Sequence, residues 1–348
     1  MWVEPFSLPL ESPLETAKGS IPNRRGFLVG LEGKNDDQPA GIGEATPLPG
    51  WTESHEACQK ALAATSPTTA ETHPDPATTP AAAHAVELAE LDARGRRTST
   101  PLAGVLRAEI GADTTIPATV PVNATIGDGT IDETVTAAET AIEEGYDCLK
   151  LKVGSRAVDE DIQRVRGVRK AVGDGVEMRV DANGAWAEST AETAITAFAA
   201  LDVAYVEQPL AAEALAAHSR LRGQGVDIAL DESLAEVSVE TVIERGAADV
   251  VILKPMALGG PLQAIHAAAT AREHGIEPVV TTTIDGVVAR TAAVHVAAAI
   301  PNIAACGVAT GSLLAEDLTA DAVTISGGTA SVPTGGGLCG EQFDALQH

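Results

Sequence analysis

A regular alternation of short apolar runs and alanine-rich amphipathic stretches constrains the fold more than any other feature of this chain, and it begins near residue 121. The apolar runs have the length of buried strands, and the stretches between them have the apolar spacing of helices. The residues that end the predicted strands lie 23 to 29 residues apart and are Asn123, Lys152, Asp181, Glu207, Asp231, Lys254, Thr281 and Gly307. Eight units of this length are typical of an α/β fold with a closed (β/α) barrel.

A doubly wound open sheet is the competing fold, and it normally carries a glycine-rich phosphate-binding turn after its first strand. Neither NATIGDG at residues 123–129 nor GIGEAT at residues 41–46 matches that fingerprint. The sequence therefore favours the barrel.

The N-terminal part of the chain has a different pattern. Short β-prone stretches at residues 27–31 and 41–45 predict a small antiparallel sheet, and residues 53–64 and 81–97 have helical spacing. Between these helices, residues 66–80 contain four prolines and several threonines, which predicts a surface loop. The tail at residues 326–348 is too short to be a domain, and we expect it to pack back on the N-terminal sheet.

The acidic composition excludes several classes of partner. The formal net charge of −26 repels nucleic acid and anionic membrane surfaces, and its spread along the chain resembles that of halophilic proteins. Cysteines 58, 148, 306 and 339 have no metal-binding spacing, as expected of free thiols in a reducing cytoplasm. No apolar run approaches the roughly 20 residues of a membrane span. We expect a cytoplasmic protein without nucleic-acid or membrane partners, and a homo-oligomer is left open.

Lysines lie unexpectedly in apolar strands. In CLKLKVG at residues 148–154, the two-residue period of a strand places Lys150 and Lys152 on one face, pointing into the barrel. Lys254 ends another apolar strand, VVILK. Three of the seven lysines thus lie in strands of the buried type, although lysine is normally a surface residue.

Carboxylates end the three strands between these lysine strands, namely Asp181, Glu207 and Asp231. Three carboxylates that converge at one end of a barrel repel one another unless a cation neutralises them. Ligation by oxygen alone suits Mg²⁺, with Mn²⁺ as a possible substitute. A single carboxylate at a strand end is usually a helix N-cap, but five charged residues on successive strands favour a catalytic site.

Neighbouring polar residues are more ambiguous. Asn183 lies one alternation beyond Asp181 and is either a turn former or a substrate contact. Glu232 faces away from its neighbour Asp231, so it is expected to support that ligand from behind. His295 lies in an alanine-rich segment and is predicted to be a core histidine.

Together these residues predict removal of a weakly acidic proton next to a carboxylate. A divalent metal on the substrate carboxylate stabilises the extra negative charge of an enediolate. The cation also favours the neutral form of a nearby lysine, which then acts as the base. Lysines on opposite sides of the metal reach opposite faces of the substrate.

The pattern resembles the muconate-lactonising branch of the enolase superfamily. The resemblance covers nearly the whole chain and rests on Lys150, Lys152, Asp181, Glu207, Asp231, and Lys254 followed by Pro255 and Gly259-Gly260. It implies an α+β capping domain at residues 1–115, a modified (β/α)7β TIM-like barrel at residues 116–325, a C-terminal tail at residues 326–348, and Mg²⁺.

Three segments resemble the o-succinylbenzoate synthases of menaquinone biosynthesis, particularly archaeal ones: residues 9–26, 41–54 and 307–318. In that family the residue matching Lys152 takes a proton and later protonates the departing hydroxyl, while the residue matching Lys254 stabilises the charged intermediate from the other face. The loops at residues 11–23 and 48–53 would cover the site, with Trp51 either as an apolar wall or as domain-interface packing.

The chain departs from this family after the seventh strand. Ser-Ser and a nearby Glu are replaced by Thr281, Thr282, Thr283 and then Asp285. Hydroxyls for substrate contact are retained in Thr282 and Thr283, and these two residues, Asn183 and Gly307 are the candidate substrate-binding residues.

The sequence leaves other functions open. An N-succinylamino acid racemase, a dipeptide epimerase or a muconate cycloisomerase-like enzyme would use the same carboxylates and lysines. Two readings from other classes are a Schiff-base aldolase built on Lys254 and a degenerate barrel that only binds ligands.

Overall fold

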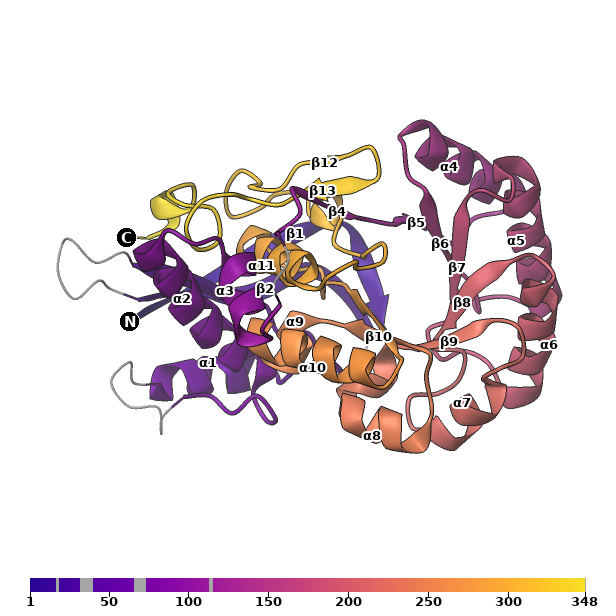
Figure 1. Cartoon of the computed structure of the whole chain (residues 1–348), viewed down its shortest axis with the longest axis horizontal. Helices are drawn as coiled ribbons and strands as arrows, with labels where there is room; N and C mark the ends of the chain where they lie inside the picture. The colour runs from indigo at the N-terminus through magenta and orange to yellow at the C-terminus, as the bar shows by residue number, and fades with distance from the viewer. Residues whose placement is uncertain (17–18, 32–39, 66–72, 113–114, 348) are drawn as a thin grey trace.

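The computed structural model describes residues 1–16, 19–31, 40–65, 73–112 and 115–347. A sheet of parallel strands curls around the right-hand part of the molecule, and an antiparallel N-terminal sheet lies at the other end with its own helices (Figure 1). This is the predicted combination of a TIM-like barrel with a separate α+β unit.

The barrel sheet has seven parallel strands in the order β11-β10-β9-β8-β7-β6-β5. These strands are β5 (Ala124–Ile126), β6 (Cys148–Lys152), β7 (Glu177–Asp181), β8 (Val203–Glu207), β9 (Asp227–Leu230), β10 (Val250–Leu253) and β11 (Glu277–Val280). Its helices are α4 (Ile131–Glu143), α5 (Val158–Val172), α6 (Glu188–Ala199), α7 (Leu215–Leu221), α8 (Val239–Arg245), α9 (Pro255–Leu258), α10 (Pro261–Glu273) and α11 (Val287–Ala299). Strand and helix alternate as predicted, because apolar strand faces are covered by the apolar stripes of the helices.

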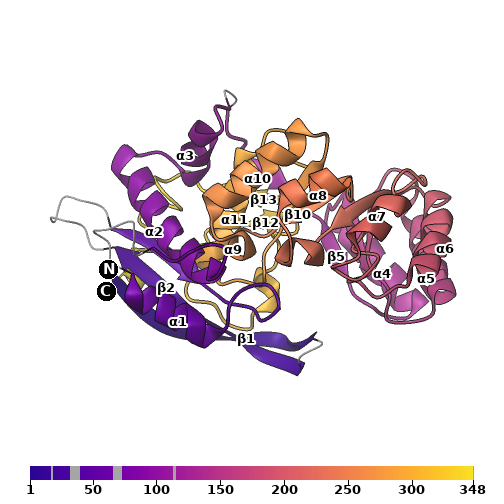
Figure 2. The same ribbon diagram turned by 90° about the horizontal axis from the view of Figure 1, so that it is seen from below.

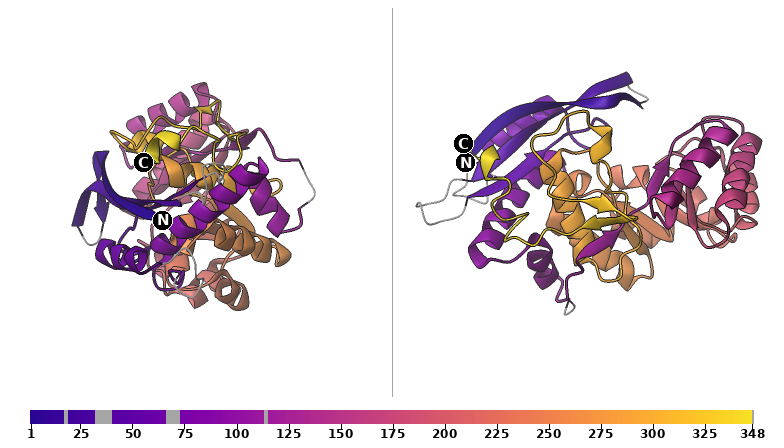
Figure 3. Two further views of the ribbon diagram at one scale, coloured as in Figure 1. Left: turned by 90° about the vertical axis from the view of Figure 1, so that its left-hand side faces the viewer. Right: turned by 90° about the horizontal axis from the view of Figure 1, so that it is seen from above.

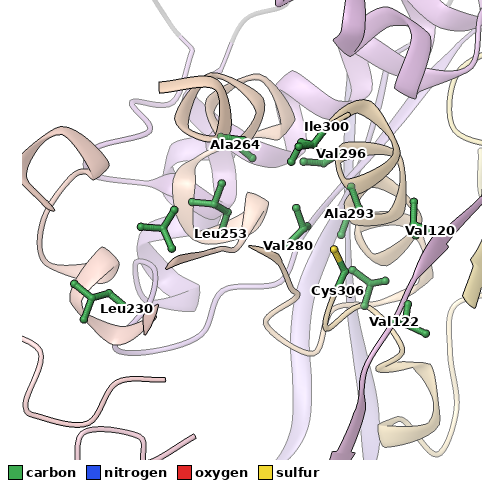
Figure 4. Packing of buried hydrophobic residues seen from close by; sticks show 14 of the residues in the cluster. Val120, Val122, Leu230, Leu253, Ala264, Val280, Ala293, Val296, Ile300 and Cys306 are labelled. Carbon is green, nitrogen blue, oxygen red and sulfur yellow. The ribbon is translucent and has the colours of Figure 1, made fainter. Parts of the chain in front are cut away.

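The eighth strand position is reduced to isolated bridges. Cys306 pairs with Val122 and Gly307 pairs with Thr281, so residues 306–307 connect β11 to the chain that leads into β5. Figure 4 shows Val122, Cys306 and Val280 in the apolar core at this junction. The prediction that Asn123 ends the first strand was wrong, because pairing between β5 and β6 continues to Ile126.

The N-terminal sheet contains β1 (Trp2–Thr16), β2 (Gly19–Leu31) and β3 (Gly41–Ala45), all antiparallel. Its helices are α1 (His55–Ala64), α2 (Pro80–Thr98) and α3 (Leu102–Glu109). Gly43 on β3 lets α2 approach closely, since a Cβ there would lie 1.9 Å from the carbonyl oxygen of Ala85. The strand β1 was not predicted because three prolines interrupt its sequence, and an edge strand tolerates proline.

The first predicted cover loop is largely a β-hairpin. Leu14 pairs with Ile21, so β1 and β2 form a long two-stranded ribbon that Figure 2 shows at the edge of the molecule. A register shift between Pro9 and Leu14 lets pairing continue past the prolines. Of the predicted loop at residues 66–80, residues 66–72 lie outside the described part, and Pro80 begins α2.

The C-terminal segment closes the fold near the N-terminus (Figure 3). Strand β12 (Ile325–Ser326) pairs with β13 (Thr329–Ser331), and β13 pairs with β4 (Thr119–Pro121), which precedes the barrel. Leu338 donates its N–H to Asp92 Oδ1 on α2, at 2.8 Å. Its carbonyl lies 2.6 Å from Nε2 of the fully buried His295 on α11, so that histidine has a packing role. The residue boundaries of the domains remain predictions.

Two further sequence features can be checked in the described residues. The four cysteines are free thiols. Across the described part of the chain, no helix combines the length and the apolar character that crossing a membrane requires.

Candidate active site

The charged residues predicted from the sequence meet at the C-terminal end of the barrel strands. Lys152 is the register partner of Asp181, and Asp181 is the partner of Glu207. Asp231 and Lys254 directly follow β9 and β10. Parallel neighbours end at the same edge of the sheet, which is why residues far apart in sequence converge there.

Each lysine is paired with a carboxylate. The Lys152 Nζ donates to Asp181 Oδ2 at 2.6 Å, and Lys150 Nζ lies 2.9 Å from Glu207 Oε1 and 3.2 Å from Asp181 Oδ2. At the other side of the site, Lys254 Nζ lies 2.7 Å from Asp231 Oδ2. The structure thus brings all six predicted catalytic and metal-binding residues together, whereas their roles remain predictions.

The three lysines of the site differ in how much of the side chain is exposed to solvent. The Lys152 side chain is 34% exposed, compared with 14% for Lys150 and 10% for Lys254. Lys152 is therefore the lysine that a substrate in the barrel mouth can reach most readily.

Burial and charge act in opposite directions within this cluster. Burial would lower the pKa of Lys150, but the carboxylates of Glu207 and Asp181 outweigh it and hold that pKa well above its ordinary value. Burial would raise the pKa of Asp181, but Lys150 and Lys152 hold it below its ordinary value. For Glu207, burial and then the charge of Asp181 raise the pKa to about 8. Lys150 consequently stays cationic and stabilises the carboxylates electrostatically.

The donor set fits a hard divalent cation. Three buried carboxylate oxygens have no hydrogen-bond partner: Glu207 Oε2, Asp231 Oδ1 and Glu232 Oε2. Such groups are costly unless something satisfies them, and oxygen donors are what Mg²⁺ prefers. As the side chains lie, the described residues include no group of three His, Cys, Asp or Glu side chains gathered to hold a metal, because the lysine ammonium groups pair with the carboxylates.

Asn183 has the geometry of a turn former, which is one of the two roles that the sequence left open for it. It adopts a left-handed φ of 45°, which asparagine tolerates, and its N–H donates to Asp181 Oδ1 at 3.0 Å. Its side chain accepts from Lys152 and donates to Glu232 Oε1, each at 2.9 Å. Asn183 and Glu232 therefore orient Lys152 from behind, and substrate contact by Asn183 remains a prediction.

The predicted substrate-binding hydroxyls already have hydrogen-bond partners within the protein. Thr282 Oγ1 lies 2.8 Å from Thr310 Oγ1, and Thr283 donates its hydroxyl to Asp285. Gly307 is tightly packed, since a Cβ there would lie 2.6 Å from Thr281 Oγ1. These contacts fix the loop, while a role in substrate binding remains a prediction.

Trp51 makes a contact that sequence reasoning did not anticipate. The Nζ of Lys254 lies 3.2 Å from the centroid of the Trp51 ring, which is a cation–π geometry. Trp51 belongs to the loop between β3 and α1, so the N-terminal unit contributes directly to the surroundings of a proposed catalytic lysine.

Two buried charges join the N-terminal unit to the loop after β11. Glu44 on β3 accepts hydrogen bonds from Gly286 N at 2.7 Å and Ala289 N at 2.9 Å, at the beginning of α11. Arg24 Nε donates to the carbonyl of Ile284 at 3.1 Å. Ile284 has a φ of 61°, a costly conformation for a β-branched residue, so these contacts hold a strained turn in place. A lone glutamate inside the apolar strand GIGEA was the only sequence signal for this connection.

Comparison with known proteins agrees with this geometry. Residues 133–344 match the family model described as "Enolase C-terminal domain-like". The chain is 38% identical over 218 residues to the o-succinylbenzoate synthase of Thermobifida fusca, covering 62% of this chain and 67% of that protein.

Two solved structures share the whole fold. The substrate-liganded L-Ala-D/L-Glu epimerase of Bacillus subtilis has a TM-score of 0.84 at 28% identity, with 97% of each chain covered. The dipeptide epimerase of Enterococcus faecalis, in complex with Mg and the dipeptide L-Leu-L-Tyr, has a TM-score of 0.82 at 26% identity, again with 97% of each chain covered. The chain therefore belongs to the enolase superfamily, with muconate cycloisomerase-like enzymes among its relatives.

Proposed function

We propose that this protein is an o-succinylbenzoate synthase of menaquinone biosynthesis. It would catalyse the Mg²⁺-dependent syn-dehydration of 2-succinyl-6-hydroxy-2,4-cyclohexadiene-1-carboxylate to 2-succinylbenzoate. The observation that carries the proposal is the placement of Lys152 and Lys254 at opposite ends of a row of three buried carboxylates. Similarity to the Thermobifida fusca synthase supports this substrate over others.

Asp181, Glu207 and Asp231 would hold the metal ion. Mg²⁺ is the proposed cofactor because all three are oxygen donors and because the Enterococcus faecalis epimerase was solved with Mg, whereas Mn²⁺ is a candidate substitute. When bound, the cation would supply the positive charge that makes a proton next to a carboxylate more acidic.

Lys152 is the acid-base residue in this proposal. Its Nζ takes the proton next to the substrate carboxylate, and the electron pair of the broken C–H bond moves onto that carboxylate to give an enediolate; the pair then forms the new double bond as the C–OH bond breaks. The same Nζ returns the proton to the departing hydroxyl, which leaves as water. One residue can perform both transfers because a syn elimination places both groups on one face. Asn183 holds Lys152 in position.

Lys254 would act by charge from the opposite face. Its ammonium group is held between the carboxylate of Asp231 and the ring of Trp51. Both contacts hold this ammonium group at the site, where its charge would stabilise negative charge on the substrate.

A racemase or epimerase is the second candidate. The presence of a lysine on each side of the carboxylates is what two-base proton exchange requires, and the two epimerase structures cover nearly the whole chain. N-succinylamino acids or dipeptides would then be the substrates, and Lys152 and Lys254 would both exchange protons.

A substrate panel tests the proposal. The Mg²⁺-loaded protein is assayed with the cyclohexadiene carboxylate, N-succinylamino acids, the dipeptide L-Ala-L-Glu and muconate. We expect kcat/KM to be highest for dehydration, and deuterium exchange into N-succinylamino acids to be slower by at least about tenfold. Faster racemisation, epimerisation or cycloisomerisation than dehydration would replace the proposal with the corresponding activity.

A further inference from the structure

Arg107, on α3, is a buried arginine for which the described part of the chain provides no counter-ion. Its side chain is only 4% exposed, and its single hydrogen bond runs from Nη1 to the carbonyl of Ala298, at 3.3 Å. Its Nε and Nη2 are both buried and have no hydrogen-bond partner. Among the described residues, no Asp or Glu forms an ion pair with it.

Two other buried arginines, Arg164 and Arg169, have partners for all of their guanidinium nitrogens. Arg169 donates to four backbone carbonyls, those of Leu201, Gly173, Val176 and Asp202. Arg164 pairs with Asp161 at 2.9 Å and also donates to backbone oxygens. Leaving a buried charged donor unsatisfied is destabilising, so the free edge of Arg107 requires an explanation.

The unpaired nitrogens are those that recognise oxyanions. Nε and Nη2 lie on the same edge of the guanidinium group and present two parallel N–H bonds. This edge matches two oxygens of a carboxylate or phosphate, and the resulting two-point hydrogen bond is among the strongest in proteins.

A cavity of about 260 Å³ adjoins this side chain. Thr115, Thr119 and Asn302 contribute polar groups to its wall, and the described residues of the lining include no Asp or Glu. The remaining lining is mostly apolar, including Val120 and Ile300, which Figure 4 shows in the adjoining core. Arg107 is itself one of the residues that line the cavity.

The cavity lies at the barrel end away from the lysines and carboxylates. Strand β4, at its wall, precedes β5, and residues 300–303 precede the bridging residues 306–307. Both segments therefore enter the barrel at the N-terminal ends of its strands. The proposed catalytic residues occupy the C-terminal ends.

We propose that this cavity is a binding site for a small oxyanion that presents two adjacent oxygens, a carboxylate or an inorganic phosphate, held by Arg107. The anion supplies the negative charge that pairs with the Arg107 guanidinium group. Thr115, Thr119 or Asn302 bind its remaining oxygens. The site is independent of the catalytic centre and of its reaction.

Thermal unfolding of the metal-free full chain at constant ionic strength tests this site, with sodium phosphate, acetate or chloride as the probe. Phosphate or acetate should raise Tm saturably, by about 2 °C or more at saturation, since ligands of the folded state stabilise it. Chloride, a single-atom anion, cannot span the guanidinium edge and should have less effect. Whichever of phosphate and acetate saturates at the lower concentration identifies the class of ligand.

Substitutions of Arg107 test whether the rise in Tm comes from anion binding at this residue. Arg107→Met should abolish the saturable rise, and Arg107→Lys should raise the half-saturating concentration at least about tenfold, because lysine cannot form the two-point contact. Arg94→Met is the matched control: Arg94 pairs with Glu109 of the same helix as Arg107, and its loss should leave the rise intact. An equal response to chloride, no saturable response in the wild type, or an undiminished response in Arg107→Met or Arg107→Lys would overturn the proposal.

Discussion

The buried carboxyl of Glu44 makes the stability of this protein depend on pH in a way that Glu44→Gln should remove. Burial, and then the charge of Asp285, raise the pKa of Glu44 from 4.5 to about 7. Asp317 adds to this effect, and Arg24 and His84 are the other ionisable groups that face Glu44. All four remain in the variant, so their own contributions largely cancel when the two proteins are compared.

Because the pKa of Glu44 is raised in the folded state, its carboxyl makes the protein less stable as pH rises. Below pH 4.5, Glu44 is neutral in both the folded and the unfolded chain. Between pH 4.5 and 7 the unfolded chain loses the proton while the folded chain keeps it, so the free energy of unfolding falls as pH rises and levels off above pH 7. The difference between the unfolded and the folded pKa of Glu44 corresponds to a loss of roughly 3 kcal/mol in the free energy of unfolding.

Glutamine does not titrate, but the substitution lowers the free energy of unfolding by an amount that does not depend on pH. Its oxygen can accept from only one of the two N–H groups that Glu44 satisfies, and its amide nitrogen faces the other. An unsatisfied buried donor costs about 1–3 kcal/mol. The variant should therefore be less stable than the wild type at pH 5, and it should gain roughly 3 kcal/mol relative to the wild type by pH 8.

Urea unfolding at pH 5, 6, 7 and 8 measures this difference, with Glu4→Gln on an exposed part of β1 as the control. A stability difference between Glu44→Gln and wild type that stayed within about 0.5 kcal/mol over this range would refute the reasoning, because it would show that Glu44 titrates alike in both states.

Three further predictions concern the proposed active site. Metal-stripped protein should lose turnover and regain it with Mg²⁺, and Glu207→Gln and Asp231→Asn should weaken metal binding measured by calorimetry; full activity of either variant in chelator would exclude the metal site. Trp51→Ala should raise KM or alter substrate preference while circular dichroism shows an intact fold, and unchanged kinetics would exclude a lid role. Lys152→Arg should abolish dehydration because arginine does not release a proton. Lys254→Arg should retain measurable dehydration but no racemase activity. If both variants lost dehydration equally, with folding and metal binding preserved, that result would favour the two-base mechanism.

Much of the candidate site could be predicted from the sequence because its information is local. In a strand, alternate residues share a face, so CLKLK placed both lysines inside the barrel. Regular strand spacing then placed Asp181, Glu207 and Asp231 at one end of the sheet. The strand β1 was not predicted from the same kind of pattern, because its prolines are tolerated only at a sheet edge and edge position is a property of the assembled sheet.

The sequence alone determined the alternation of strands and helices in the barrel, the acidic composition and the set of charged residues at the strand ends, since each depends on residue type and short-range spacing. Only the tertiary structure decided which lysine pairs with which carboxylate, that Trp51 lies over Lys254, and that Glu44 accepts hydrogen bonds at the start of α11. It also revealed the unpaired edge of Arg107 beside a cavity. These contacts join residues up to 245 positions apart, as for Glu44 and Ala289, and such pairings are set by the packing of whole elements, which no local pattern specifies.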